Sequence, residues 1–128
     1  MNETITRLLV VDDEAIVGKR LNQVFSKMGF EIETCTDPAA ALAAAANRPF
    51  DVVVTDLKME GMDGMEVLRR VKAMNPETRV IIITGYASPD TAELARQHGV
   101  FEFLAKPFRL DELKQVIFRA LKSLPPSD

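Results

Sequence analysis

The stretches Leu8-Leu9-Val10-Val11-Asp12-Asp13 and Val52-Val53-Val54-Thr55-Asp56 decide the fold, because each is a strand-forming run that ends in aspartate. Aliphatic runs without polar interruption are typical of parallel strands that are buried on both faces. If the two runs pair in parallel, their carboxyl ends meet at one edge of the sheet. The sequence therefore predicts that Asp12, Asp13 and Asp56 lie close together.

Further strand-forming runs alternate with segments of helical periodicity, which predicts five successive βα units in a single α/β domain. The runs are Leu8–Val11, Phe30–Cys35, Asp51–Thr55, Val80–Ile83 and Val100–Leu104. The first, third and fourth are uninterrupted, as expected of central strands. The second alternates and the fifth carries an interior charge, as expected of edge strands. The strand order 2-1-3-4-5 of the flavodoxin-like doubly wound parallel sheet satisfies these properties, and its ligand crevice lies beyond the carboxyl ends of strands 1 and 3.

Local signals mark several helix ends. Ser88-Pro89 places a capping hydroxyl before a proline suited to the first helical position, and Gly29 predicts a left-handed end to the first helix. We expect the third helix to follow Gly64. The fourth helix is expected to be weakly anchored, because its candidate core residues are mostly small. These residues are Ala92, Leu94 and Ala95.

Composition and charge exclude several classes of protein. The 128 residues suit one domain, and a net charge of −3 with scattered basic residues argues against nucleic-acid binding by this domain alone. The start, Met1–Thr4, lacks the regions of a signal peptide. The longest uncharged apolar stretch, Ala39–Ala46, is far shorter than the ~18 residues of a membrane span. We therefore expect a cytoplasmic protein that binds other proteins and no membrane.

The expected cluster of aspartates predicts phosphoryl chemistry. Crowded carboxylates need a neutralising partner, and a hard divalent cation such as Mg²⁺ binds carboxylate and phosphate oxygens. Thr84 ends the fourth run and Lys106 follows the fifth, so both belong at the same edge. Asp56 is the best-placed nucleophile for an acyl phosphate, with Lys106 balancing phosphoryl charge and Thr84 offering a hydroxyl donor.

Asp12-Asp13, Asp56, Thr84 and Lys106-Pro107, with these spacings, resemble the receiver domain of two-component response regulators. The resemblance covers about residues 6–123 and leaves 124–128 as a short proline-containing tail. It implies that a histidine kinase or phosphotransfer protein donates a phosphoryl group to Asp56, with Mg²⁺ (or Mn²⁺) as cofactor. The implied metal ligands are Asp12, Asp13, Asp56 and the backbone carbonyl of Lys58.

The resemblance also implies a switch. Thr84 would move toward the phosphoryl group and Phe103 would turn inward, which alters the surface of the fourth helix, fifth strand and fifth helix. That surface would control a downstream protein target or an output domain, and a phosphorylation-dependent homodimer is compatible with it. The Lys106-Pro107 bond is implied to be cis. Such a domain is a signalling module that is not an enzyme, since its only chemistry is its own phosphorylation and dephosphorylation.

Three residues are expected to tune the lifetime of the phosphoryl group. Glu60 stands where receivers commonly carry proline, and Lys58 and Tyr86 flank the route of the attacking water. We hypothesise slow self-dephosphorylation, with Tyr86 shielding the acyl phosphate and Lys58 pairing with Glu60 or phosphate.

Other classes remain as alternatives. A haloacid dehalogenase-type phosphatase would carry a second aspartate two residues after the nucleophile, where this chain has Lys58. A pseudo-receiver would have little need for the acids, Thr84 and Lys106 together. Flavin or dinucleotide binding is disfavoured because no glycine-rich phosphate motif follows the first strand. Both a stand-alone receiver and a receiver cut from a longer protein fit the sequence.

Overall fold

Five parallel strands form one sheet in the order β2-β1-β3-β4-β5, which confirms the predicted topology. The computed structural model describes residues 5–59 and 61–123. The strands are β1 (Arg7–Val11), β2 (Glu31–Cys35), β3 (Val52–Asp56), β4 (Arg79–Thr84) and β5 (Glu102–Ala105). The helices are α1 (Ala15–Lys27), α2 (Pro38–Asn47), α3 (Gly64–Met74), α4 (Pro89–Gln97) and α5 (Leu110–Lys122).

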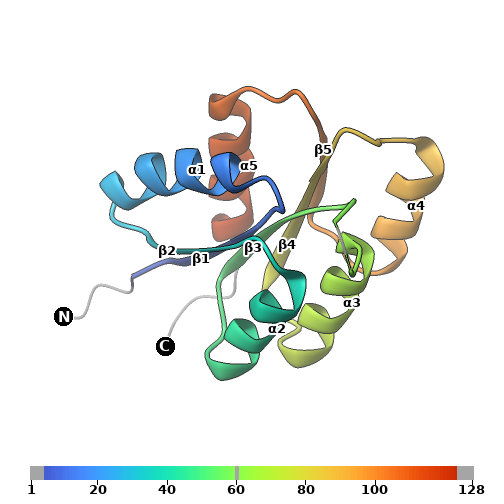
Figure 1. Cartoon of the computed structure of the whole chain (residues 1–128), viewed down its shortest axis with the longest axis horizontal. Coiled ribbons are helices and arrows are strands. Elements are labelled where there is room, and N and C mark those ends of the chain that lie inside the picture. Colours follow the sequence, from blue (N-terminus) through green and yellow to red (C-terminus); the bar gives the residue numbers. More distant parts are fainter. Residues whose placement is uncertain (1–4, 60, 124–128) are drawn as a thin grey trace.

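Helices cover both faces of the sheet. In Figure 1, α1 and α5 lie on one side, and α2 and α3 lie on the other. Successive residues of β1 explain this arrangement: Leu8 and Val10 pack with the α1 and α5 side, whereas Leu9 and Val11 pack with the α2 and α3 side. Both layers are apolar, so the central strands had to be hydrophobic at every position.

The register of the strands brings the candidate polar residues to one edge. Val11 pairs with Thr55, and Thr84 pairs with Ala105. Asp56 is itself the last residue of β3, whereas the predicted run ended at Thr55. The side chains that follow these positions therefore gather at the carboxyl ends of β1, β3, β4 and β5.

The predicted helix ends are confirmed, except that the third helix includes Gly64 and does not follow it. Gly29 has φ of +90°, and α3 begins at Gly64 behind the capping side chain of Asp63. Ser88 accepts a hydrogen bond from the backbone N–H of Thr91 at the start of α4. Within the described residues, no helix combines the length and the apolar character needed to cross a membrane.

Helix α4 is lightly anchored, as expected, but Leu94 does not contribute to its anchoring. Ala95 is the one fully buried residue of this helix, and Leu94 is 43% exposed. The prediction that Leu94 is a core residue is wrong because the small side chain of Ala95 occupies the contact face. Few buried contacts lower the free energy needed to move the helix.

The connection from β3 to α3 is tight because Gly64 approaches the end of β3. The backbone N–H of Gly64 donates to the carbonyl oxygen of Leu57 at 2.7 Å. A Cβ at Gly64 would overlap the backbone carbonyl of Asp56. A glycine here therefore fixes how closely α3 packs beneath Asp56.

We expect Gly64→Ala to lower the free energy of unfolding by about 1–3 kcal/mol, because the added methyl group overpacks against backbone atoms that cannot rotate away. Urea unfolding followed by circular dichroism measures the change. Gly85→Ala is the matched control, since a Cβ there meets nothing within 4 Å. Equal stabilities for the two variants would contradict the prediction.

Candidate functional site

Three carboxylates meet at the carboxyl edge of the sheet, as predicted. Asp12, Asp13 and Asp56 each offer a carboxylate oxygen, and these oxygens all lie within 4.8 Å of one another. Asp12 and Asp56 are buried, whereas Asp13 is exposed. Such a cluster of like charges is unfavourable unless a cation lies beside it.

The Lys106 ammonium provides a positive charge beside two acids of this cluster. Its Nζ donates to Asp56 Oδ2 at 2.9 Å and to Asp12 Oδ2 at 3.1 Å. The same nitrogen donates to Glu14 Oε1 at 3.2 Å. Sequence analysis missed Glu14, although its place directly after Asp12-Asp13 at the start of a helix was a usable signal. Three carboxylates thus contact one ammonium, and Asp13 is the fourth carboxylate of the described site.

Burial and ion pairing shift two pKa values in this cluster. Burial raises the pKa of the Asp12 carboxyl, although hydrogen bonds from the Glu14 backbone and from Lys106 partly offset this effect. Burial alone would lower the pKa of the Lys106 ammonium. Its hydrogen bonds to Asp56 and Asp12 outweigh burial and hold that pKa above its ordinary value. Lys106 is therefore charged throughout the physiological range.

A backbone N–H contacts Asp56, and a buried hydroxyl lies at the end of the neighbouring strand β4. The backbone N–H of Lys58 donates to Asp56 Oδ1 at 3.3 Å. Thr84 is fully buried, and its Oγ1 accepts from the backbone N–H of Tyr86 at 3.0 Å. That bond leaves the hydroxyl proton of Thr84 free to donate elsewhere. The edge thus combines the Asp56 carboxylate with several hydrogen-bond donors.

Two of the residues expected to tune the site contact each other, and their effect on the phosphoryl lifetime stays a prediction. The Lys58 ammonium lies 5.9 Å from the centre of the Tyr86 ring, over its face, in a cation–π contact. Tyr86 is 65% exposed. Glu60 lies outside the described residues, so its pairing with Lys58 stays a prediction.

Two further residues named by the resemblance have defined surroundings. Phe103 on β5 is half-buried and packs against the apolar layer that contains α2 and α3. The Lys106–Pro107 peptide bond is cis, as the resemblance implies. The backbone N–H of Lys106 donates to the carbonyl oxygen of Thr84 at 2.8 Å, which ties β5 to β4 at this edge.

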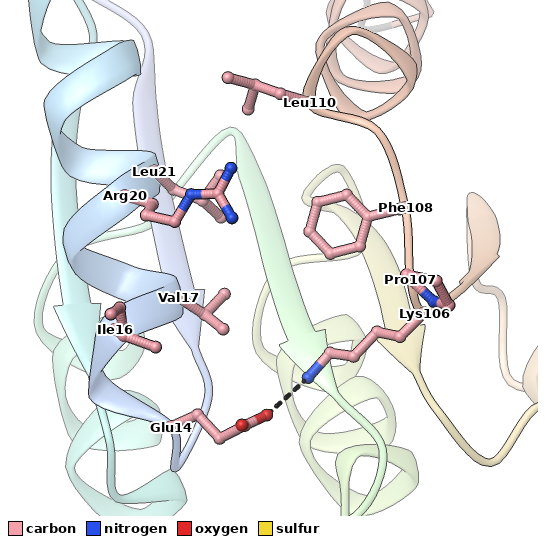
Figure 2. A pocket seen from close by; sticks show the side chains of 9 residues that line it. All are labelled: Glu14, Ile16, Val17, Arg20, Leu21, Lys106, Pro107, Phe108 and Leu110. Atoms are coloured by element: carbon pink, nitrogen blue, oxygen red, sulfur yellow. Dashed lines mark hydrogen bonds and ion pairs between the residues drawn. The ribbon is translucent and has the colours of Figure 1, made fainter.

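A cavity of about 500 Å³ adjoins the cluster between α1 and the β5–α5 connection. Its walls are largely apolar, and Figure 2 shows Val17 and Phe108 facing each other across it. Glu14 and Lys106 close one end of the cavity, where a dashed line in the figure joins them. Asp56 does not line this cavity, so the carboxylate cluster and the apolar hollow are neighbours that share Lys106.

The donor set fits a hard divalent cation. Mg²⁺ and Mn²⁺ bind carboxylate oxygens, and the three aspartates supply such oxygens at mutual distances that one ion could span. No histidine or cysteine belongs to the described cluster, which disfavours softer metals. The carbonyl of Lys58 stays a predicted fourth ligand.

Known proteins are similar to this chain in sequence and in fold. A family model described as the response regulator receiver domain matches residues 8–118. The regulatory protein AtoC of Escherichia coli is 39% identical over 118 residues, which is 92% of this chain and 26% of AtoC. Sporulation initiation phosphotransferase F of Bacillus subtilis is 35% identical over 121 residues, which is 94% of this chain and 95% of that protein.

The structural match is equally extensive. A receiver domain protein (CheY-like) from Methanospirillum hungatei superimposes with a TM-score of 0.90 at 27% identity, covering 93% of this chain and 95% of that one. The chain thus spans nearly all of some relatives and about a quarter of AtoC.

We expect Asp12→Asn to stabilise the fold at pH 7 in the absence of divalent cations. Because burial raises the pKa of Asp12 above 3.8, the folded state binds the proton more tightly than the unfolded state. The free energy of unfolding therefore falls as pH rises from 3.8 through the raised pKa, and asparagine avoids that loss.

Urea midpoints for both proteins at neutral pH and at about pH 3 measure this effect. The urea midpoint of Asp12→Asn should be higher than that of wild type at pH 7, and the two midpoints should be equal in acid. Glu77→Gln, which removes an exposed carboxylate near the opposite end of β4, controls for the lost charge. A variant that is less stable than wild type at pH 7 would refute the interpretation.

Proposed function

The chain belongs to the response regulator receiver family and is a receiver domain of two-component signalling, and from that premise we propose that Asp56 is its phosphoacceptor. The observation that carries the proposal is the Lys106 ammonium, which contacts Asp56 at 2.9 Å and Asp12 at 3.1 Å. A lysine that bridges the nucleophile and a metal-binding acid is suited to balance phosphoryl oxygens on Asp56.

The proposed reaction moves one phosphoryl group. An oxygen of Asp56 attacks phosphorus while the bond from phosphorus to the donor histidine nitrogen breaks, and the freed imidazole takes up a proton. Asp56 suits this role because it ends β3 and is held by the Lys58 backbone N–H and by Lys106. An oriented nucleophile avoids much of the entropic cost of a bimolecular step.

Lys106 and Thr84 supply the other protein groups. The ammonium that now neutralises the aspartates can pair with a phosphoryl oxygen, and its raised pKa keeps it charged while it does so. The Thr84 hydroxyl proton is free to donate to a second oxygen. Mg²⁺ or Mn²⁺, held by Asp12, Asp13, Asp56 and the Lys58 carbonyl, would supply charge neutralisation at the phosphoryl oxygens.

The proposed output follows from Thr84 and Phe103. Movement of Thr84 toward the phosphoryl group and inward rotation of Phe103 would change the surface of α4, β5 and α5. Two observations support α4 as the mobile element: Ala95 is its one fully buried residue, and Leu94 is 43% exposed. A lightly anchored helix is easily biased by a local change in charge.

Partners and location complete the proposal. We infer a cytoplasmic signalling domain that receives phosphoryl groups from a histidine kinase or phosphotransfer protein. Its target is a partner protein or an output domain, since AtoC is about four times as long as the matched region. The domain has no separate substrate and is not an enzyme in the usual sense.

We expect acetyl phosphate with Mg²⁺ to add one phosphoryl group to this chain and none to Asp56→Asn, as measured by intact mass. Omission of Mg²⁺ should abolish the adduct. Continuous release of phosphate by the Asp56→Asn variant, or an adduct in it, would instead place the chemistry on another residue. A folded wild-type chain that binds Mg²⁺ and forms no adduct would support a pseudo-receiver.

We expect Tyr86→Ala to shorten the lifetime of the aspartyl phosphate roughly twofold to fivefold. An exposed cation–π contact contributes about 0.5–1 kcal/mol. If this contact keeps Lys58 and Tyr86 over the site, its loss lowers the barrier to hydrolysis by that amount, which corresponds to a roughly twofold to fivefold faster decay. Decay of the intact-mass adduct measures the lifetime. Tyr86→Phe keeps the ring and serves as the control, and equal lifetimes for the alanine variant and wild type would disprove shielding.

A further inference from the structure

Glu14 contacts the functional lysine from the surface of the protein. Its Oε1 lies 3.2 Å from Lys106 Nζ, and Figure 2 shows the two side chains reaching toward each other from the N-cap of α1 and the β5–α5 connection. The Glu14 side chain is 63% exposed, whereas those of Asp12 and Asp56 are 1% and 8% exposed. The ammonium therefore has two buried acceptors and one exposed acceptor.

The two buried acceptors belong to the acids that are suited to a divalent cation. Lys106 donates to the Oδ2 atoms of Asp12 and Asp56. Both residues belong to the cluster whose oxygens lie within 4.8 Å of one another. Two cations that share these carboxylates repel each other strongly at such short range. Repulsion between the two cations therefore favours weaker buried contacts of Lys106 when Asp12 and Asp56 bind a divalent cation.

Glu14 offers the ammonium an acceptor that remains available. Its backbone N–H donates to Asp12 Oδ1 at 2.9 Å, which fixes the start of α1 next to the cluster. Lys106 carries three N–H donors on a flexible stem, so it can shift toward Glu14 without leaving the site. Loss of the buried contacts is then partly compensated by a stronger contact with Glu14.

We propose that Glu14 is a positioning residue that keeps Lys106 beside Asp56 while the aspartates bind a divalent cation. The inference rests on the proposed function and deepens its metal-binding step. It assigns a role in the site to a residue that neither the spacing of the aspartates nor the family resemblance identified. The remaining acids of the cluster bind the ion, whereas Glu14 acts through Lys106.

Glu14→Gln should weaken Mn²⁺ binding by the full chain roughly threefold to tenfold, because a neutral amide oxygen is a weaker acceptor for the displaced ammonium than the Glu14 carboxylate. Electron paramagnetic resonance of free Mn²⁺ during titration measures the affinity directly. Glu77→Gln carries the same charge change at a distance and should bind Mn²⁺ as wild type does. Urea unfolding checks that each variant is folded.

A double-mutant cycle separates action through Lys106 from a general charge effect. Lys106→Met should bind Mn²⁺ more tightly than wild type because it lacks the competing ammonium. In that background Glu14→Gln should change the affinity less than about twofold, since coupled residues are not additive. An equal loss of affinity in both backgrounds would mean that Glu14 acts by charge alone and would overturn the proposal.

The lysine ammonium resonance gives a second readout that a merely structural role would not change. With saturating Mg²⁺, the ¹⁵N-detected signal of Lys106 should persist in wild type and broaden in Glu14→Gln, because the ion pair protects its protons from exchange. If wild type binds Mn²⁺ tightly and Glu14→Gln binds it with the same affinity, this inference is overturned and the proposed function stands. Absence of any Mn²⁺ binding by wild type overturns both.

Discussion

The structure depends on gathering like charges at one edge of a hydrophobic sheet. Parallel pairing of β1 with β3 is favoured by burial of apolar side chains on both faces, and it leaves Asp12 and Asp56 side by side with little solvent around them. The Lys106 ammonium, at 2.9 Å and 3.1 Å from these carboxylates, offsets part of the resulting repulsion. Removal of one partner from such a group leaves an uncompensated charge, so the lysine and the acids constrain each other. The same crowding makes this edge suitable for a divalent cation.

The sequence was sufficient to predict the fold because the pattern and the packing agree at every level. Uninterrupted runs became the central strands, the alternating run became the edge strand β2, and glycine and capping residues marked helix ends where expected. Leu94 was misassigned because helical spacing does not show which side of a short helix carries the contact. Ala95, a smaller side chain on the same helix, is the residue that packs.

The candidate site was predictable in its strand ends and less so in its contacts. Asp12, Asp13, Asp56, Thr84 and Lys106 were found because parallel topology fixes where strand ends lie. Glu14 was missed because its contact with Lys106 depends on how a long side chain from the β5–α5 connection crosses the edge to α1. The pairing of Lys58 with the Tyr86 ring likewise joins two loops, whose side chains strand order does not specify.

One short segment connects the charged edge to the lightly held helix. The Thr84 hydroxyl oxygen accepts the backbone N–H of Tyr86, and Ser88 caps α4 only two residues further along the chain. If Thr84 moves toward a phosphoryl oxygen on Asp56, the Oγ1 atom that accepts the Tyr86 N–H moves with it, and the loop must follow or lose this hydrogen bond. The adjacent helix has a single fully buried residue, so the rearrangement meets little resistance from packing. The rigid edge and the weak helix are therefore complementary requirements: the first localises the change in charge, and the second converts it into a change of surface.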